Sequence, residues 1–311
     1  MTSTVTAPAP SPIEAEPALD KPRSLGSEAW SQLRRRPMFW ISAALIVVIL
    51  LMAIFPSLFT SVDPYAGDLD RSRQAPSLDS QASWFGYDSV GQSVYARVVY
   101  GARASVLVGF LTTLVVTVIG SFLGTLAAYY GRKTDMLVSR IGDIFFGIPL
   151  LLGALIVLVS FPSDEHTPEW ETIMKVVLAL ALLGWPVIMR LMRSSVLQVK
   201  SGDYVMAARA LGASGSRVIR KHVVPNAIAP VIVYSTISLG VYITVEATLS
   251  FLGIGLQPPV VSWGVMIADA QTYLRIAPHM LMFPSAFLSV TVLAFIMLGD
   301  VVRDALDPKL H

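Results

Sequence analysis

The chain of 311 residues contains no cysteine, so disulfides, thiolate metal sites and cysteine nucleophiles are excluded. Charged residues are also scarce: they make up 14% of the chain, whereas 54% of its residues are hydrophobic. Such a small polar share is too little to cover a soluble body of this size, and the composition is typical of membrane proteins. The formal net charge of +2 is too near zero to suggest nucleic-acid binding.

Recognisable catalytic and metal-binding patterns are missing as well. No Gly-x-x-x-x-Gly-Lys-Ser/Thr run occurs, so no segment is predicted to hold nucleotide phosphates. No nucleophile–base or metal constellation supports an intramembrane enzyme. The histidines are scattered, and no pair of them has metal-ligand spacing on one helix; they are His166, His222, His279 and His311. We expect a chain that is not an enzyme and binds no metal or other cofactor itself.

Six stretches are apolar and long enough to cross about 30 Å of hydrocarbon as helices of about 20 residues. We predict them at 39–59, 104–129, 136–160, 173–193, 227–250 and 283–302. Trp185-Pro186 interrupts the fourth, but proline is tolerated in a membrane helix when neighbouring groups satisfy the freed carbonyl. The predicted fold is therefore an all-α membrane protein with six transmembrane helices.

The positions of Lys and Arg predict the orientation of these spans. With the N-terminus inside the cell, 17 of the 23 basic residues fall on the inner side. Because cytoplasmic loops carry an excess of Lys and Arg, both termini are predicted to be cytoplasmic.

The ends and the long loops divide the chain. Residues 1–29 are rich in Pro, Ala, Ser and Glu without apolar periodicity, and we expect them to be disordered. The basic cluster Arg34 to Arg36 precedes an apolar run longer than a signal-peptide core, with no small-residue cleavage site after it, so 30–60 is predicted to be a retained anchor. The remaining divisions are an outer loop at 61–103, a five-helix core at 104–302 and a C-terminal cytoplasmic tail at 303–311.

Two outer segments invite an interpretation. Asp88 is expected to cap a short helix that carries Val90, Val94 and Val98 on one face. Such a helix either lies on the outer membrane surface or is an ordinary packed loop helix, and the spacing does not decide between the two. The loop 251–282 is apolar but broken by Gly and Pro, so it is too irregular to span, and we expect it to form the external mouth of a pathway.

The basic loop 203–226 is the most informative segment, since it is polar and lies between long apolar runs. We predict a first helix from Asp203, as its N-cap, to about Leu211, with Gly212 in the left-handed conformation that ends helices. Ala207 and Ala208 are small, so the backbone of a partner can approach closely. The alternative is a basic loop that only fixes topology.

A second short helix is predicted to follow within the same loop. Ser214 or Ser216 is its expected N-cap, and it carries three basic residues, namely Arg217, Arg220 and Lys221. Pro225 is expected to stop this helix and Asn226 to cap the next span. Pro230 then lies in that span's first turn, where its missing amide hydrogen matters little.

Several motifs together resemble ABC importer permeases. Ala207-Ala208, then Gly212, then His222-Val-Val-Pro225-Asn226 is similar to the EAA loop of that family. Three further runs resemble the dipeptide and oligopeptide subgroup: Gly86-Tyr-Asp88-Ser-Val-Gly91 with Arg97 and Gly101-Ala-Arg103; Glu246-Ala-Thr-Leu-Ser-Phe-Leu-Gly253-Ile-Gly255-Leu-Gln-Pro-Pro with Ser262-Trp263-Gly264; and Leu298-Gly299-Asp300-Val-Val-Arg303-Asp304-Ala-Leu-Asp307-Pro308. The resemblance covers roughly 30–310 and is greatest to the C-type permease subunit.

This resemblance implies a function and partners. The fold would be the type I importer permease fold, in the bacterial cytoplasmic membrane, and the chain would import dipeptides or oligopeptides. The implied partners are a second, homologous permease, two cytoplasmic ATPase subunits or one fused pair, which would bind the ATP and Mg, and an extracytoplasmic substrate-binding protein. The loop 203–226 would be the coupling helix that docks into an ATPase groove. Its implied coupling residues are Asp203, Met206, Ala207, Ala208, Leu211, Gly212, Arg217, His222 and Pro225.

The sequence also departs from the family pattern. Met206 stands where the family has the acid that names the EAA loop, and an acid there would complete a capping box and favour the helix dipole. We expect the helix to survive without that acid because Asp203 remains. Gln92 and Ser93 stand where the family often has Arg and Asp, which weakens inference about the outer helix only.

Charged residues inside the spans need partners, since a charge at mid-bilayer costs about 2.5–3.5 kcal/mol even on lenient scales. Glu246, with Ser250 and Trp263, is a candidate for the translocation pathway; the alternative for Glu246 is a structural hydrogen bond to another helix. Local ion pairs are expected one turn apart: Arg140 with Asp143 and Asp300 with Arg303.

Two other transport functions stay open. A permease for nickel or a metal chelate shares these motifs, and the lack of clustered His and Cys does not exclude it because the binding protein usually selects the substrate. An ion-coupled secondary transporter would need paired buried carboxylates in broken helices at mid-membrane, for which Glu246 alone is thin support.

Overall fold

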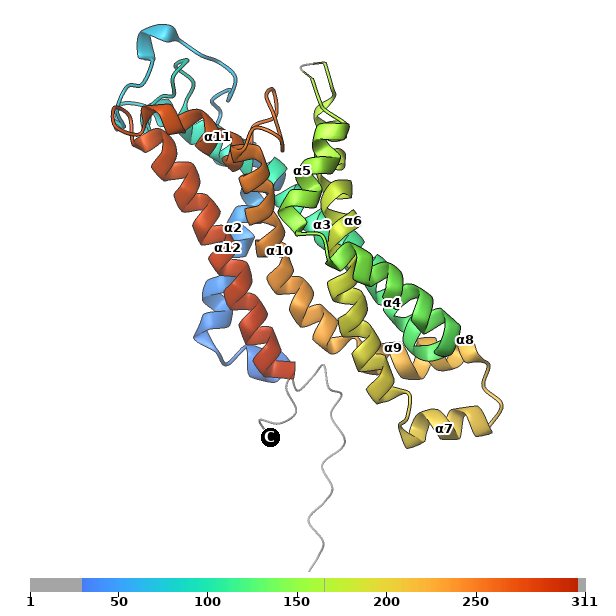
Figure 1. The fold of residues 1–311 in the computed structure, drawn as a ribbon. Coiled ribbons are helices and arrows are strands. Elements are labelled where there is room, and N and C mark those ends of the chain that lie inside the picture. Colours follow the sequence, from blue (N-terminus) through green and yellow to red (C-terminus); the bar gives the residue numbers. More distant parts are fainter. Residues whose placement is uncertain (1–29, 165, 307–311) are drawn as a thin grey trace, which may run out of the picture.

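The computed structural model describes residues 30–164 and 166–306 (Figure 1). The expectations for the tail 1–29 and for residues 307–311 lie outside these ranges. Within them the chain is helical, and the only bridge between extended segments is an isolated one from Tyr87 to Ser93. Residues 303–306 do not begin a separate tail but continue the last helix.

Five of the described helices are long and apolar enough to cross a membrane. They are α2 (Pro37–Ile54), α3 (Val94–Tyr130), α6 (Glu169–Val199), α10 (Ala229–Phe251) and α12 (His279–Leu306). A sixth crossing exists if the pair α4 (Arg132–Phe146) and α5 (Leu150–Ser160) is counted as one broken span. The all-α, six-span prediction is confirmed in this sense.

The third span was predicted as one continuous helix at 136–160, and this is wrong. The axes of α4 and α5 meet at 83°, with the break at Gly147, Ile148 and Pro149. Pro149 has no amide hydrogen to donate, and it disfavours the helical conformation at Ile148 before it. Figure 1 shows α4 in the lower half of the molecule and α5 in the upper half.

The prediction of a separate short helix on the outer surface is also wrong. Residues from Val94 onward are the first turns of α3, which is 37 residues long and therefore about 55 Å. Ser93 rather than Asp88 is its N-cap, and the Ser93 hydroxyl accepts from the Ala96 amide at 3.3 Å. Val94 and Val98 are buried against the protein, whereas Val90 is exposed.

The core lies where α3 packs along α6, the most extensive helix pair in the molecule. Two glycines on α3 allow this approach: a Cβ at Gly120 would meet Ile188, and one at Gly124 would meet the Met189 carbonyl. Small residues let membrane helices pack backbone to backbone. Pro186 lies inside α6, as the sequence predicted, and is buried there.

At the outer end, the 55–93 loop folds onto the start of α12. Its short helices are η1 (Pro56–Leu58), η2 (Leu69–Arg71) and η3 (Gln81–Ser83). The rings of Phe85 and Phe283 stack with centroids 3.9 Å apart, and His279 Nε2 lies 3.1 Å from the Tyr87 carbonyl oxygen. The 251–282 loop is less irregular than expected, since it contains α11 (Trp263–Ala270) and η5 (Gln271–Tyr273).

Neither predicted local ion pair forms among the described residues. Asp143 instead pairs with Arg190 of α6 at 2.8 Å, which ties α4 to α6. Asp304 rather than Asp300 carries an ion pair near the inner end of α12, and its partner is Arg36, just before α2. Residues distant in sequence were better placed for both pairs than residues one turn away.

Candidate functional site

The basic loop 203–226 lies at the opposite end of the molecule from the 55–93 loop (Figure 1). It contains α7 (Asp203–Ala210), α8 (Gly215–Val218), the π-helical turn η4 (Ile219–Val223) and α9 (Val224–Ala227). Gly202 is the N-cap of α7, so the prediction of Asp203 in that role is wrong. Asp203 is the first helical residue, where its negative charge still faces the positive end of the helix dipole.

Gly212 has φ +80°, which confirms the predicted left-handed stop after α7. The Gly212 amide donates to the Arg209 carbonyl at 2.9 Å, and the Ala213 amide donates to the Ala208 carbonyl at 3.1 Å. Ser214 then occupies the N-cap position of α8, although its side chain makes no capping bond. The two helices are therefore joined by a tight, hydrogen-bonded turn.

Pro225 does not stop the second helix, contrary to the prediction. The chain stays helical through η4 and α9, with Pro225 in the first turn of α9. A π turn just before a proline accommodates the missing amide hydrogen and the bulk of the ring. Asn226 does not cap the next span either: its Nδ2 donates to the His222 carbonyl at 2.7 Å. The predicted placement of Pro230 in the first turn of α10 is confirmed.

The loop is fixed firmly to the membrane helices. Three valines, Val205, Val218 and Val223, are completely buried in the core beside α3 and α6. The Arg209 guanidinium of α7 lies 5.0 Å from the centroid of the Tyr129 ring on α3. Just before the loop, the Lys200 ammonium at the end of α6 donates to the Ala128 carbonyl of α3 at 2.6 Å. These contacts connect α7 and the rest of the loop to the inner ends of α3 and α6.

The loop leaves three large apolar side chains uncovered. Leu211 is 89% exposed, Met206 54% and Tyr204 47%. We call these three residues the coupling patch. Large apolar side chains left exposed on one short helix and at its end are available to a partner. The predicted coupling residues are also mostly accessible: Asp203, Met206, Ala207, Leu211, Gly212, Arg217 and Pro225 are exposed, and Ala208 and His222 are half-buried.

The proposed pathway residues lie in a different environment. Glu246, Ser250 and Trp263 are all buried inside this chain, Glu246 completely. Ser250 Oγ donates to Glu246 Oε1 at 2.8 Å, and Ser262 Oγ donates to the same oxygen at 3.3 Å. The cluster joins α10 to the segment that leads into α11, so in this conformation none of the three faces an open passage.

Trp263 completes this junction on the α3 side. Its backbone amide donates to Ser105 Oγ at 3.2 Å, and its indole Nε1 donates to the Val98 carbonyl at 2.9 Å. Gly264 lets α11 approach closely, because a Cβ there would press on Ala247 and Ser250. The geometry matches the structural alternative for Glu246, a hydrogen bond between elements.

An ion-paired cluster lies beside this junction at the outer face. The Arg97 guanidinium pairs with Asp88, and its other nitrogen lies 3.7 Å from an Asp269 carboxylate oxygen on α11. Asp88 Oδ1 also accepts from the amides of Val90 and Gln92. Burial raises the pKa of Asp269, against the opposing effect of Arg97. The cluster fixes the outer loop to α3 and α11.

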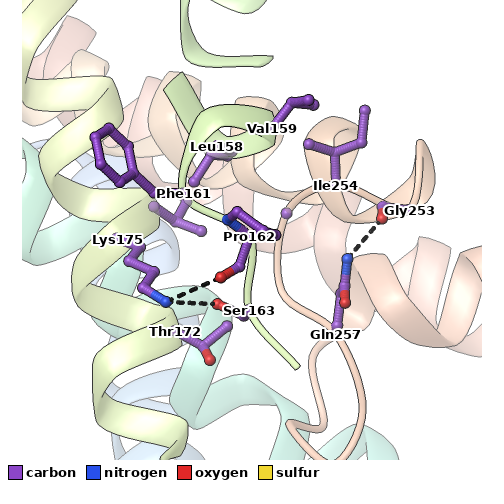
Figure 2. A pocket seen from close by; sticks show the side chains of 12 residues that line it. Leu158, Val159, Phe161, Pro162, Ser163, Thr172, Lys175, Gly253, Ile254 and Gln257 are labelled. Atoms are coloured by element: carbon purple, nitrogen blue, oxygen red, sulfur yellow. Dashed lines mark hydrogen bonds between the residues drawn. The ribbon is translucent and has the colours of Figure 1, made fainter. Parts of the chain in front are cut away.

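A small cavity of about 170 Å³ lies at the outer end of the molecule (Figure 2). It lies between the end of α5, the start of α6 and the Gly253–Gln257 turn. Lys175 donates to the Pro162 carbonyl at 3.2 Å and also pairs with Glu171 at 3.1 Å. Gln257 Nε2 donates to the Gly253 carbonyl at 2.8 Å. Because Lys175 and Gln257 already have partners, the cavity has the character of a packed corner.

A larger cavity at the α4–α5 break was missed by sequence reasoning. It has a volume of about 280 Å³ and is bounded by α6 and α10 as well as by the break. The Gly147-Ile-Pro149 run within an apolar stretch could have indicated a broken helix. Transporters place binding sites at such half-helices in the middle of the membrane. No group of three His, Asp or Glu residues within the described chain is placed to hold a metal ion.

Comparison with known proteins gives consistent matches over most of the chain. The family model "Binding-protein-dependent transport system inner membrane component" matches residues 117–311, and the model "N-terminal TM domain of oligopeptide transport permease C" matches residues 24–76. Together they cover the anchor and most of the core.

Three relatives illustrate the similarity. The dipeptide transport system permease protein DppC of Alkalihalophilus pseudofirmus is 38% identical over 91% of this chain and 90% of its own length. The oligopeptide transport system permease protein OppC of Bacillus subtilis is 35% identical over 96% of this chain and 94% of its own. The glutathione transport system permease protein GsiD of Pectobacterium atrosepticum is 36% identical over 91% of both chains.

The fold has a solved counterpart. An inward-facing structure of the MetNI methionine ABC transporter matches with a TM-score of 0.54 and 22% identity. The match covers 67% of this chain and 95% of that chain. At this identity the likeness concerns the fold alone, and it places the helices in the arrangement of an ABC importer permease.

Proposed function

Because this chain belongs to the family of binding-protein-dependent transport system inner membrane components, we propose that it is the permease subunit through which an ABC importer moves dipeptides or oligopeptides. The family consists of membrane permeases of ABC importers, whose ATPase is a separate subunit, so the chain is not an enzyme. The peptide substrate is supported by relatives named for dipeptide and oligopeptide transport that align over more than nine-tenths of the chain.

The observation that carries the proposal is the coupling patch. Tyr204, Met206 and Leu211 are left uncovered by this chain, while Val205 of the same helix is completely buried. A helix that is anchored by a buried side chain and exposes large apolar side chains fits the groove of a separate cytoplasmic subunit. The missing family acid at Met206 does not disrupt α7, which forms with Asp203 in its first turn.

The proposed assembly follows from this arrangement. A second, homologous permease encloses the pathway with this chain, two ATPase subunits or one fused pair hold ATP and Mg below, and an extracytoplasmic binding protein delivers the peptide. This chain binds no cofactor itself. Closure of the ATPases moves α7 as a rigid piece, and its anchors carry the movement into α3 and α6, so that the pathway alternates between two packed states.

The test is to change the coupling patch without disturbing its anchors. Leu211→Asp places a charge on a side chain that is 89% exposed, so the fold should be retained. Ala207→Trp adds bulk to the exposed side of α7. Both variants should lose co-purification of the ATPase subunits and peptide uptake, because the groove no longer fits.

The control is Lys133→Trp, which introduces the same side chain at an exposed position at the inner end of α4, outside the coupling loop. It should retain both ATPase binding and uptake. Normal ATPase binding and uptake by Leu211→Asp and Ala207→Trp would contradict the coupling role.

The substrate is tested separately with the wild-type complex reconstituted with its binding protein. Labelled dipeptide, tetrapeptide, glutathione and nickel chelate are compared for uptake. We expect a dipeptide or oligopeptide to be moved fastest. Preferred uptake of the nickel chelate would identify the alternative metal importer, and uptake without ATPase subunits would identify a secondary transporter.

A further inference from the structure

The cavity at the α4–α5 break lies at the middle depth of three membrane helices. Gly184 on its wall is the middle residue of α6, and Tyr242 lies two residues beyond the middle of α10. The break at 147–149 also divides the α4–α5 span near its centre. Three elements therefore place this cavity near the bilayer midplane, where transporters with broken helices bind substrate.

The N-terminus of α5 meets this cavity. Pro149, Leu150 and Ile148 all line it, and α5 is 11 residues long. The first amides of a helix have no intrahelical acceptor, and the helix dipole gives them a partial positive charge. A helix end in this position favours an anionic group.

A second, independent feature of the cavity is the Tyr242 hydroxyl. Tyr242 lines the cavity and is only 6% exposed, yet no residue in the described part of the chain forms a hydrogen bond with this hydroxyl. The neighbouring Ser238 differs, because its hydroxyl donates to the Tyr234 carbonyl at 2.8 Å. A phenol hydroxyl that lines a cavity and has no partner is free to donate to an acceptor that enters it.

The remaining walls add shape. Phe145, Leu183 and Val187 make the cavity largely apolar, and none of its lining residues is acidic. Next to the lining residue Phe146, the Arg190 guanidinium lies 3.9 Å from the centroid of that ring and pairs with Asp143. The rim residues Ile148 and Tyr234 are each 39% exposed, so the cavity opens to the surface of this chain.

We propose that this cavity is a substrate-contact site that receives the C-terminal carboxylate of a peptide in transit. The carboxylate accepts hydrogen bonds from the first amides of α5 and from the Tyr242 hydroxyl, and the apolar walls accept the last side chain. The volume of about 280 Å³ fits one terminal residue. This inference rests on the proposed function and specifies how this chain contacts its substrate.

The first test compares a peptide with its C-terminally amidated form in the complete reconstituted complex. The affinity of the binding protein for each peptide is measured separately and divided out. Tyr242→Phe should lower uptake of the free-acid peptide about tenfold, as expected when a hydrogen bond to a charged group is lost. Uptake of the amidated peptide should hardly change.

The matched control is Thr244→Val, which removes a hydroxyl from the same helix. The Thr244 hydroxyl donates to the Gly240 carbonyl at 3.0 Å and does not line the cavity. It should leave uptake of both peptides unchanged. Equal behaviour of Tyr242→Phe and Thr244→Val towards both peptides would overturn the inference.

A labelling readout decides the question if Tyr242→Phe fails to assemble. The chain has no cysteine, so Ile148→Cys at the rim can be labelled alone with a small thiol reagent. Excess free-acid peptide should slow this labelling more than amidated peptide does. Ile156→Cys, on α5 but away from the cavity, should show no such difference. Equal protection at Ile148 by both peptides overturns the inference.

The two proposals fail in different ways. A wild-type complex that imports no peptide would remove the proposed function, and this inference with it. A wild-type complex that imports peptide but treats free acid and amide alike after correction for binding would remove only the site.

Discussion

At the scale of single residues, the buried pair of Arg97 and Asp88 has the largest expected effect on stability. Both side chains are nearly buried, so Asp88→Ala leaves a buried cation without its main partner. Removing one member of a buried ion pair destabilises a protein by about 3–5 kcal/mol. We expect a clear fall in the thermal unfolding temperature of the purified complex, measured by loss of tryptophan signal on heating.

The control for this prediction is Asp68→Ala. The Asp68–Arg71 pair has a 3.3 Å separation but is half exposed on both sides, and exposed pairs contribute about 0–1 kcal/mol. It should leave the unfolding temperature almost unchanged. Equal shifts for the two variants would mean that the Arg97 cluster does not hold the outer loop.

Glu246 gives a second prediction at this scale. Glu246→Gln retains the oxygen that accepts from Ser250 and Ser262, so it should cost little. Glu246→Ala leaves both hydroxyls without that acceptor and creates a cavity, with an expected loss of about 2–4 kcal/mol. Thermal unfolding of both variants, beside Thr248→Ala on the same helix, checks the order. A Gln variant as unstable as the Ala variant would show that the negative charge itself is required.

Sequence reasoning identified these residues but not their partners. Glu246 stood out because an acid in an apolar span needs a partner. The sequence of α10 does not indicate whether that partner is water in a pathway or Ser262. Asp143 was assigned to Arg140 by helical spacing, but Arg190 on another helix is the partner found. Long-range pairs depend on how helices pack, and a single sequence does not carry that information.

At the scale of elements, the packing of α3 on α6 depends on two glycines. A Cβ at Gly120 would lie 2.9 Å from the Trp185 carbonyl oxygen and 2.7 Å from the Ile188 side chain. Because the nearest atoms include backbone, Gly120→Ala forces the helices apart, and overpacking of this kind costs about 1–3 kcal/mol.

Gly147→Ala is the same change at a site where the nearest atom to a new Cβ is 3.4 Å away. It should be neutral or slightly stabilising, since alanine loses less backbone entropy than glycine. The yield of monodisperse complex and its unfolding temperature distinguish the two. A tolerated Gly120→Ala would show that α3 and α6 can separate without loss of fold.

Existence and order of the helices followed from hydropathy, whereas their breaks and lengths did not. The start of α3 at Val94 was missed because its first turns carry Arg97 and Arg103, which lowered the apolar signal although Val94 and Val98 are buried in the protein. Pro149 broke a predicted span, while Pro186 and Pro225 did not end their helices. Whether proline breaks a helix depends on neighbouring groups that only the fold supplies.

At the scale of the whole molecule, the two ends have different chemical character. The outer end is built from loops fixed by stacked rings and buried pairs, and the inner end presents an anchored helix with the coupling patch. Between them lies the mid-depth cavity, with walls on α6, which leads directly into the coupling loop, and on α10, which leads directly out of it. Two helices therefore connect α7 with the walls of the proposed substrate-contact site.

The orientation of the whole chain is the last prediction. Basic residues gather at the end that carries Arg209, Arg217 and Lys221, so this end should be cytoplasmic.

The absence of native cysteine allows single-cysteine labelling without background. Leu78→Cys, at a position 90% exposed in the outer loop, should react with a membrane-impermeant maleimide in intact cells. Ser216→Cys, exposed at the coupling end, should react only after permeabilisation and denaturation, which removes any bound ATPase. The unmodified chain should not react at all. Labelling of Ser216→Cys in intact cells, with Leu78→Cys protected, would invert the molecule and place the coupling patch beyond the reach of any cytoplasmic ATPase.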